Sequence, residues 1–168
     1  STATDFAFAS YFTKANYKLL HRYLLGASIR VDGSSRFGKD NRYGVFPALS
    51  AGWIITEEGF LQNSDFLSFL KLRGSVGRTG NAEIGNFSSL SLFSATDYAD
   101  VAGLIASQIG VPDLSWERTD QVDIGLDFGL MNNRITGEID YFTKNTNDLL
   151  LNVPLPAVNG FTTITKNI

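Results

Sequence analysis

The chain has 168 residues, with 14 basic and 17 acidic side chains, one histidine and no cysteine. This length is sufficient for a domain with a hydrophobic core, and the net charge of -3 offers no basic footprint for nucleic acid. The absence of cysteine excludes a disulfide scaffold and thiol chemistry, and a single histidine excludes a histidine-rich metal site.

Long segments of alternating apolar and polar residues predict an all-β protein, because a period of two places one residue set on each face of a sheet. We expect strands at residues 5–17, 22–32, 44–56, 69–78, 116–131 and 134–144. The last strand can continue through residues 149–154, and a further strand is expected near residues 87–94. The six strands have about 10 residues or more, against ~5–6 in soluble proteins and ~9–11 in strands that cross a membrane.

The connections between these strands alternate between short and long. Residues 18–21 and 132–133 are short, and residues 33–42 are longer. Residues 79–115 exceed the usual length of a loop in a compact soluble domain, and residues 57–68 are intermediate and break the alternation. Short turns at one end and long loops at the other are typical of outer-membrane barrels.

The intermediate connection also predicts a short helical turn. Phe66, Phe69 and Leu70 have helical spacing after residues 63–65, which suit a helix cap. Aromatic residues are expected at this same end of the sheet: Tyr17, Tyr23, Trp53, Phe60 and Phe66. Aromatic side chains at one level are typical of the girdle at a membrane interface, although a soluble core with aromatic ends fits as well.

Residues 116–144 form the most informative predicted hairpin. One face is apolar, with Val122, Ile124, Leu126, Phe128, Ile135, Gly137, Ile139 and Tyr141. If Met131 pairs with Arg134 across the turn, Phe128 faces Gly137 and covers its bare backbone. The same register places Leu126 opposite Ile139. The apolar face therefore fits either a half-buried soluble sheet or the lipid-facing side of a membrane barrel.

The other face of this hairpin is acidic, with Asp123, Asp127, Glu138 and Asp140. Asp127 opposes Glu138 in the expected register, and like charges directly opposite each other are destabilising. A water-filled lumen with Arg30, Lys71 or Arg73 nearby tolerates such a pair better than a dry core does. These four carboxylates also fit a paired-carboxylate catalytic site, but their strand alternation favours a polar lumen lining.

Other motifs receive structural interpretations. The glycine-rich segment 74–80 is not a phosphate-binding loop and fits a strand that ends in a turn. Residues 32–40 carry oxygen ligands but lack the EF-hand spacing, so an outer turn is favoured over a calcium site. His21 fits a solvated turn. Four residues in or beside the long connection suit contact with sugar or peptide, although none is assigned as a ligand residue: Asn81, Tyr98, Asp100 and Trp116.

Seven segments, in order and spacing, closely resemble the barrel of the SusC/RagA family of TonB-linked outer-membrane receptors. They are residues 22–25 (RYLL), 30–38 (RVDGSSRFG), 45–53 (VFPALSAGW), 70–81 (LKLRGSVGRTGN), 116–127 (WERTDQVDIGLD), 133–141 (NRITGEIDY) and 148–151 (DLLL). The resemblance covers nearly the whole chain and is weakest at residues 1–10 and 87–111. It implies an antiparallel meander of long strands within a transmembrane β-barrel of ~22 strands whose lumen is plugged.

The resemblance also implies function. Members import glycans, peptides or similar large nutrients across the outer membrane of Gram-negative bacteria, with a SusD-like surface lipoprotein and energy supplied through TonB. Residues 1–168 are expected to be a partial barrel domain, without the plug, the TonB-contacting segment or the barrel ends. Such a piece is an open barrel wall that contacts outer-membrane lipid and does not transport alone.

Two classes of function remain open from the sequence. The first is a wall segment of a TonB-dependent importer, with no enzyme activity, no cofactor, no metal and no nucleic-acid partner. The second is a passive outer-membrane barrel or a soluble β-sheet module for binding or adhesion. The sequence assigns no catalytic, cofactor-binding, metal-binding or ligand-contacting residue.

Overall fold

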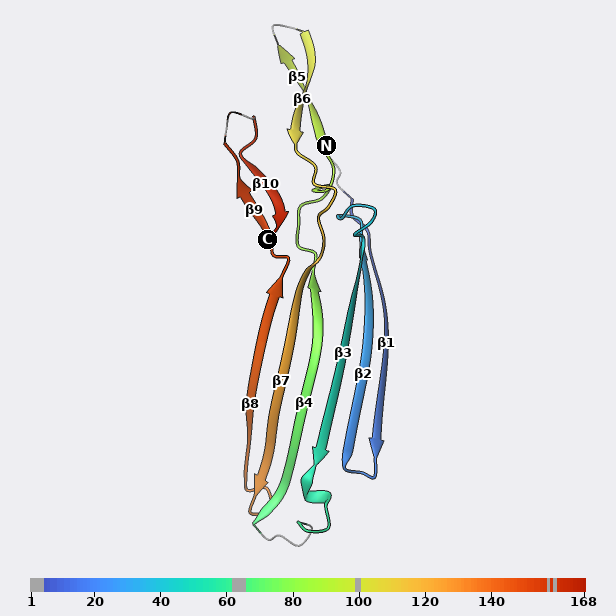
Figure 1. Ribbon diagram of the computed structural model, residues 1–168, viewed down its shortest axis with the longest axis vertical. Coiled ribbons are helices and arrows are strands. Elements are labelled where there is room, and N and C mark those ends of the chain that lie inside the picture. The colour runs from blue at the N-terminus through green and yellow to red at the C-terminus, as the bar shows by residue number, and fades with distance from the viewer. Residues whose placement is uncertain (1–4, 62–65, 99–100, 157, 159) are drawn as a thin grey trace.

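The computed structural model describes residues 5–61, 66–98, 101–156, 158 and 160–168. Its main element is a six-stranded antiparallel sheet with the order β1-β2-β3-β4-β7-β8 (Figure 1). The strands are β1 (Phe8–Leu19), β2 (Tyr23–Ser34), β3 (Tyr43–Ile54), β4 (Leu67–Asn81), β7 (Glu117–Leu130) and β8 (Ile135–Asn147). Each has between 12 and 15 residues, which confirms the six long strands predicted from the alternation.

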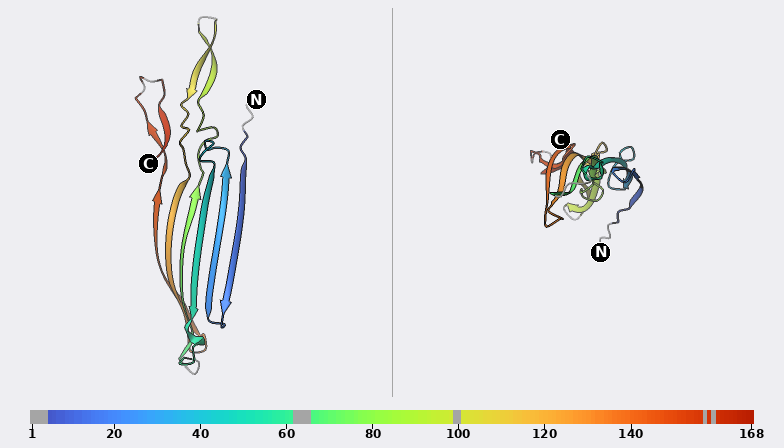
Figure 2. Two further views of the ribbon diagram at one scale, coloured as in Figure 1. Left: turned by 45° about the vertical axis from the view of Figure 1, so that its right-hand side comes forward. Right: turned by 90° about the horizontal axis from the view of Figure 1, so that it is seen from below.

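Two small hairpins extend beyond one end of this sheet (Figure 2). They are β5 (Leu92–Tyr98) with β6 (Val101–Gln108), and β9 (Leu150–Pro154) with β10 (Thr163–Asn167). We call this end of the sheet the loop end, and the opposite end, with the short β1–β2 and β7–β8 connections, the turn end (Figure 1). The strand expected near residues 87–94 overlaps β5 only at residues 92–94, and its partner β6 was not predicted.

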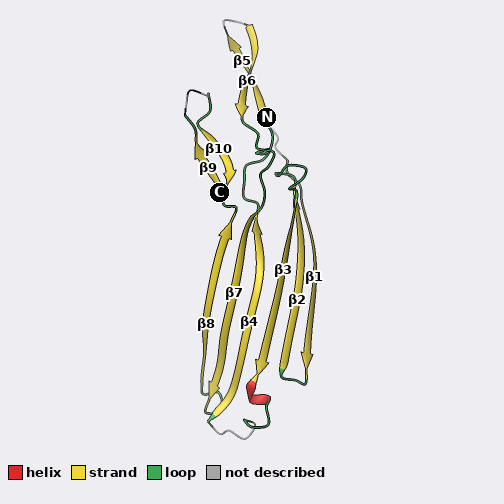
Figure 3. Ribbon diagram, viewed as in Figure 1, coloured by secondary structure: helices red, strands yellow, loops and turns green. Residues whose placement is uncertain are grey.

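Two local expectations are wrong. The helical turn at the turn end is η1 (Ile55–Glu57), whereas Phe69 and Leu70, which were expected in that turn, lie in β4 (Figure 3). Residues 63–65, the expected cap, lie outside the described residues. The sixth strand ends at Asn147, because Asp148 has a left-handed backbone (φ 57°) and β9 pairs with β10 instead. Among the described residues, no helix has the length and apolar character to cross a membrane.

The register carries the two-face alternation across all six strands. One row of paired residues on the apolar face is Tyr17, Leu25, Ala51, Gly74, Ile124 and Tyr141. The hairpin register is confirmed, since Phe128 pairs with Gly137 and Leu126 with Ile139. A Cβ on Gly137 would lie 2.6 Å from Phe128 Cζ, so the ring covers the bare backbone as expected. We call the opposite face the polar face.

The pairing of β3 with β4 is shorter than that of the other ladders in the sheet. It runs from Ile54–Lys71 to Ala48–Gly77 and stops where Pro47 comes next. Proline has no backbone N–H to donate, which limits it to edges and interruptions of a sheet. From here towards the loop end, β3 pairs only with β2 and β4 pairs only with β7. This leaves a seam between β3 and β4 at the loop end.

A small hydrophobic core closes this seam. It consists of Phe37, Phe46, Ile84, Leu114 and Trp116. The ring of Phe46 is 4% exposed and lies 5.5 Å from the Trp116 ring. Gly80 leaves space for Phe46, because a Cβ there would lie 2.3 Å from Phe46 Cε1. The core therefore lies at the loop end, and the apolar face of the sheet remains uncovered.

Hydrogen bonds fasten the long connection to its neighbours at its base. Arg36 Nε donates to Asn86 Oδ1 at 2.9 Å, and Trp116 Nε1 donates to the Arg42 carbonyl at 3.3 Å. The Asn167 side chain accepts from the Ser115 N–H and donates to the Ser115 carbonyl, both at 2.9 Å. These bonds satisfy polar groups in a part of the chain that has few ladder partners.

Candidate functional site

The polar face carries a network of charged side chains near the middle of the sheet, centred on Arg73 of β4. We call it the Arg73 network, and its members are Lys71, Arg73, Asp123, Asp127, Glu138 and Asp140. The carboxylate oxygens of the four acids lie between 2.6 and 3.7 Å from guanidinium nitrogens of Arg73. Lys71 Nζ lies 3.1 Å from Asp127 Oδ2.

Gly125 makes this network sterically feasible. It pairs with Arg73 on one side and with Asp140 on the other, so the Arg73 side chain must cross the β7 backbone at Gly125 to reach Asp140. A Cβ on Gly125 would lie 2.6 Å from Arg73 Cζ and closer still to Asp140 Oδ1. A larger residue at this position would therefore displace the guanidinium.

The Arg73 network compensates the repulsion between the two like charges expected to oppose each other in the hairpin. Asp127 does oppose Glu138, and Arg73 contacts both of them, at 2.9 and 3.7 Å. Lys71 and Arg73 are thus confirmed as the nearby cations. The alternative cation Arg30 is not part of the network, because its Nε pairs with Asp32 at 2.8 Å.

The network retains a negative excess, with two cations facing four carboxylates. The Arg73 side chain is 31% exposed and Glu138 is 73% exposed, so the network is partly hydrated. Charges in this number are stable only where water or further partners reach them. The carboxylates surround a guanidinium instead of forming an open pair, which fits a wet lining better than the paired-carboxylate catalytic site.

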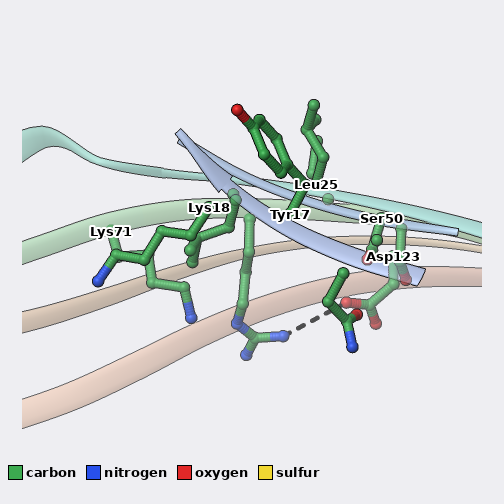
Figure 4. A pocket seen from close by; sticks show the side chains of 14 residues that line it. Tyr17, Lys18, Leu25, Ser50, Lys71 and Asp123 are labelled. Atoms are coloured by element: carbon green, nitrogen blue, oxygen red, sulfur yellow. Dashed lines mark ion pairs between the residues drawn. The ribbon is translucent and has the colours of Figure 1, made fainter. Parts of the chain in front are cut away.

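A hollow of about 520 Å³ adjoins the network on the side of β1 and β2 (Figure 4). Lys18, Lys71 and Asp123 lie on one side of the strands there, and Tyr17 and Leu25 point to the other (Figure 4). A volume of this size is within the range of ~300–1,000 Å³ found for small-ligand sites. The polar face therefore has both a charged surface and a concave one.

A second network forms at the turn end around one carboxylate. We call it the Glu58 network, because Glu58 accepts hydrogen bonds from Arg22, Tyr23 Oη and Trp53 Nε1 at 2.5, 2.9 and 3.0 Å. The bond from Trp53 and then that from Tyr23, with the charge of Arg22, hold the pKa of Glu58 below its ordinary value. This carboxylate fastens the connection after β3 to the ends of β2 and β3.

All five aromatic residues expected at the turn end lie in the described part of the chain. Tyr23 and Trp53 belong to the Glu58 network and pair across β2 and β3. Tyr17, Phe60 and Phe66 are 62%, 73% and 59% exposed. The arrangement therefore combines exposed rings with two rings whose polar atoms are already hydrogen-bonded.

Most of the other residues considered for ligand or metal contact already have partners within the fold. Asp32, from the segment considered for calcium, is buried and accepts from Ser10 Oγ at 2.6 Å and from Arg30. His21 lies in the β1–β2 turn with φ 59°. Trp116 is in the core, and Asn81 Nδ2 donates to Glu117 at 3.4 Å. Asp100 and the Tyr98 side chain lie outside the described part.

Sequence reasoning missed three residues that shape the site. Pro47 inside an alternating segment was a usable signal for a break in pairing. Gly125 lies between acidic residues on the polar face, where an isolated glycine indicates close approach of another group. Glu58 gave no signal, because the β2–β3 register brings Arg22 and Tyr23 to it, and only the turn at η1 brings Trp53.

Comparisons with known proteins agree with this geometry. The family model for the β-barrel of TonB dependent receptor-like proteins matches residues 1–168. The TonB-dependent receptor SusC of Bacteroides thetaiotaomicron is 45% identical over 175 residues, which cover 99% of this chain and 17% of SusC. A TonB-dependent receptor of Formosa agariphila is 43% identical over 167 residues, covering 99% of this chain and 16% of the relative.

Solved structures match equally well. A chain of the RagAB peptide transporter superposes with a TM-score of 0.91 and 40% sequence identity, covering 97% of this chain and 18% of that one. The open-open state of the RagAB peptide importer gives a TM-score of 0.87 at the same identity and coverage. The chain thus spans about a sixth of the length of the relatives that it matches.

Proposed function

Because this chain belongs to the TonB-dependent receptor β-barrel family, we propose that residues 1–168 form a section of the barrel wall of a longer outer-membrane receptor. The single observation that supports this most strongly is the register of the sheet. Across six strands it keeps one face apolar and uncovered from the turn end to the level of Val76 and Val122, with an Arg78–Asp120 ion pair beyond, and keeps the other face predominantly polar. This is the pattern of a wall between lipid and water.

The two faces of the sheet contact different surroundings. The apolar face contacts outer-membrane lipid, and exposed side chains such as Leu49, Ile124 and Ile139 suit that contact, with 59%, 52% and 64% of their surface free. The polar face, with the Arg73 network, lines the lumen. The turn end faces the periplasm and the loop end faces outward, because barrels of this class have short periplasmic turns and long outer loops.

The complete receptor imports large nutrients, either peptides or glycans. The supporting observations are the likeness to SusC and to the RagAB peptide transporter. It works with a SusD-like surface lipoprotein and is energised through TonB by segments outside these 168 residues. Its chemistry is binding and passage without catalysis, and nucleic acid is not a partner.

A charge on the apolar face tests the membrane assignment in the full-length receptor. We expect Ile139→Arg to destabilise the inserted barrel by about 2–4 kcal/mol, the range for arginine at the bilayer midplane. The measurement is the fraction of heat-resistant, membrane-extracted receptor in outer-membrane preparations. Thr136→Arg on the polar face of the same strand is the matched control. Equal insertion of both variants would favour the soluble module.

Uptake separates an active importer from a passive barrel. Cells that depend on the full-length receptor are supplied with a labelled peptide mixture or a labelled glycan mixture, with and without a functional TonB. We expect accumulation only with TonB, because a plugged barrel needs energy to open. Uptake that is unchanged without TonB would replace the importer by a passive barrel.

A further inference from the structure

The apolar face of the sheet does not end at the same row of paired residues on every strand. On β4 and β7 it ends at Val76 and Val122, and two residues farther towards the loop end Arg78 pairs with Asp120. Arg78 Nε and Nη2 donate to the Asp120 carboxylate at 2.7 and 3.0 Å, and the two side chains are 40% and 42% exposed. Because exposed charges are costly in hydrocarbon, the lipid-facing part of these two strands ends between Val122 and Asp120.

On β2 and β3 the apolar face continues past this level. Val122 shares its row with Ala27 of β2 and Leu49 of β3. Beyond this row β2 and β3 carry two further apolar pairs: Ile29 with Pro47, and Val31 with Val45. The outer limit of the apolar face on β2 is therefore at Val31, four residues closer to the loop end than the row of Val122.

The inner limit of the apolar face is displaced in the same sense. On β2 it lies at Tyr23, whose Oη donates to Glu58 of the turn end at 2.9 Å. The row of Tyr23 meets β7 at Leu126. On β7 the apolar face continues past Leu126 to Leu130, four residues closer to the turn end. Both limits on β7 are therefore shifted towards the turn end relative to those on β2.

The apolar segments of these two strands are equal in length and differ in position along the strand. Residues 23–31 of β2 and residues 122–130 of β7 are nine residues each. Their displacement by four residues corresponds to about 13 Å, and the three strand spacings from β2 to β7 amount to about 14 Å. A band of lipid that shifts by this much crosses the strands as it would if they were tilted by about 40–45°, which agrees with the tilt of barrel strands.

The height of the tilted band also fits a bilayer. Nine residues of strand extend about 27 Å, and at this tilt they rise about 20 Å. The side chains at the two limits add to this height, which brings it near the ~25 Å apolar band of outer-membrane barrels. One tilt therefore accounts for the equal lengths, the displacement and the height.

We propose that the bilayer crosses the apolar face diagonally. Its outer headgroup layer meets β4 and β7 at the Arg78–Asp120 ion pair, and meets β2 and β3 only beyond Val31 and Val45. The proposal rests on the proposed function, because it requires the apolar face to contact lipid. It names the partner of each residue at one level of the register, since hydrocarbon contacts Ile29 and hydrated headgroups contact Arg78 and Asp120.

The depth of three labels in the membrane tests this boundary. Single nitroxides are attached to Ala27→Cys, Val122→Cys or Leu126→Cys in a cysteine-free full-length receptor in liposomes, since this section has no cysteine of its own. Collisions with oxygen and with a water-soluble nickel chelate, measured by electron paramagnetic resonance, give the depths. We expect equal depths at positions 27 and 126, and a label at position 122 that lies about 10 Å closer to the outer surface.

The alternatives give different results. Strands that stand upright would place positions 27 and 122 at equal depth, because the two residues share a row, and would place position 126 deeper. That result, or a label at position 122 deeper than at 27, would overturn the diagonal boundary and leave the wall assignment intact. Free access of the nickel chelate to all three labels would reject lipid contact and with it the proposed function.

Arginine at two positions of one register level gives a second measurement. Asn145 of β8 pairs with Asp120, and Ile29 occupies the corresponding level of β2. We expect Ile29→Arg to lower the ratio of inserted to uninserted full-length receptor about tenfold, because it places a charge in hydrocarbon. Asn145→Arg is the matched control and should leave this ratio near that of the parent. Equal ratios for the two variants would contradict the diagonal boundary.

Discussion

The two polar networks of this wall are built in opposite ways. In the Arg73 network one cation in the middle of the sheet holds four carboxylates from two neighbouring strands. In the Glu58 network one carboxylate at the turn end collects three donors from strand ends and a turn. The first joins strands to each other, and the second fastens a connection to the strands.

The difference follows from the backbone geometry available at each place. In the middle of the sheet the register allows Arg73 to reach Asp140 only across the strand between them, so Gly125 is required. At the turn end the chain is free to turn back, and Glu58 approaches its partners from outside the sheet. The Arg73 network therefore depends on the size of the residue at position 125 of β7. The Glu58 network depends on the ionisation of the Glu58 carboxylate.

Replacement of the crossing glycine should have the largest effect on this comparison. We expect Gly125→Val to destabilise the barrel by about 1–3 kcal/mol, the usual range for overpacking, because the new side chain occupies the path of Arg73. The measurement is the thermal midpoint of the full-length receptor in detergent. Gly59→Val is the control, since a Cβ there meets no atom within 4 Å. Equal midpoints for the two variants would contradict the crossing.

Removal of the central cation should have a smaller effect that depends on salt. We expect Arg73→Gln to lower the thermal midpoint less than Gly125→Val, and the loss to shrink at high salt, where repulsion among the four carboxylates is screened. The double variant Arg73→Gln with Glu138→Gln should recover part of the loss, because Glu138 opposes Asp127 directly. A double variant no more stable than the single one would show that repulsion is not the cause.

Glu58 should contribute a still smaller, pH-dependent effect that is confined to the turn end. Because its folded-state pKa is lowered, Glu58 stabilises the folded form at pH above its ordinary value of 4.5. This contribution is lost as the pH falls from 4.5 through the lowered pKa. Hydrogen exchange of residues 54–61 should therefore accelerate in the parent relative to Glu58→Gln as the pH falls. Parallel behaviour of the two proteins would contradict the role of the Glu58 carboxylate.

The strands and one hairpin could be predicted from the sequence because their determinants are local. Alternation is a property of consecutive residues, and the two-residue turn at Asn132 and Asn133 aligns Leu126 with Ile139 without reference to the rest of the chain. The opposed pair Asp127 and Glu138 followed from the same register. The helical turn after β3 was placed wrongly because the spacing of Phe66 and Phe69 also fits the start of a strand.

The candidate site depended on alignments that no local pattern contains. Arg73 reaches Asp140 because β4 pairs with β7 across the long connection of residues 82–116, and sequence alternation does not specify that register. The same is true of the seam beside Pro47 and of the core that closes it. The sequence by itself determined which residues share a face and that the six strands are long, because side-chain direction alternates with every residue. Only the tertiary structure decided which charges meet, because strand neighbours far apart in the chain are aligned by the assembled sheet.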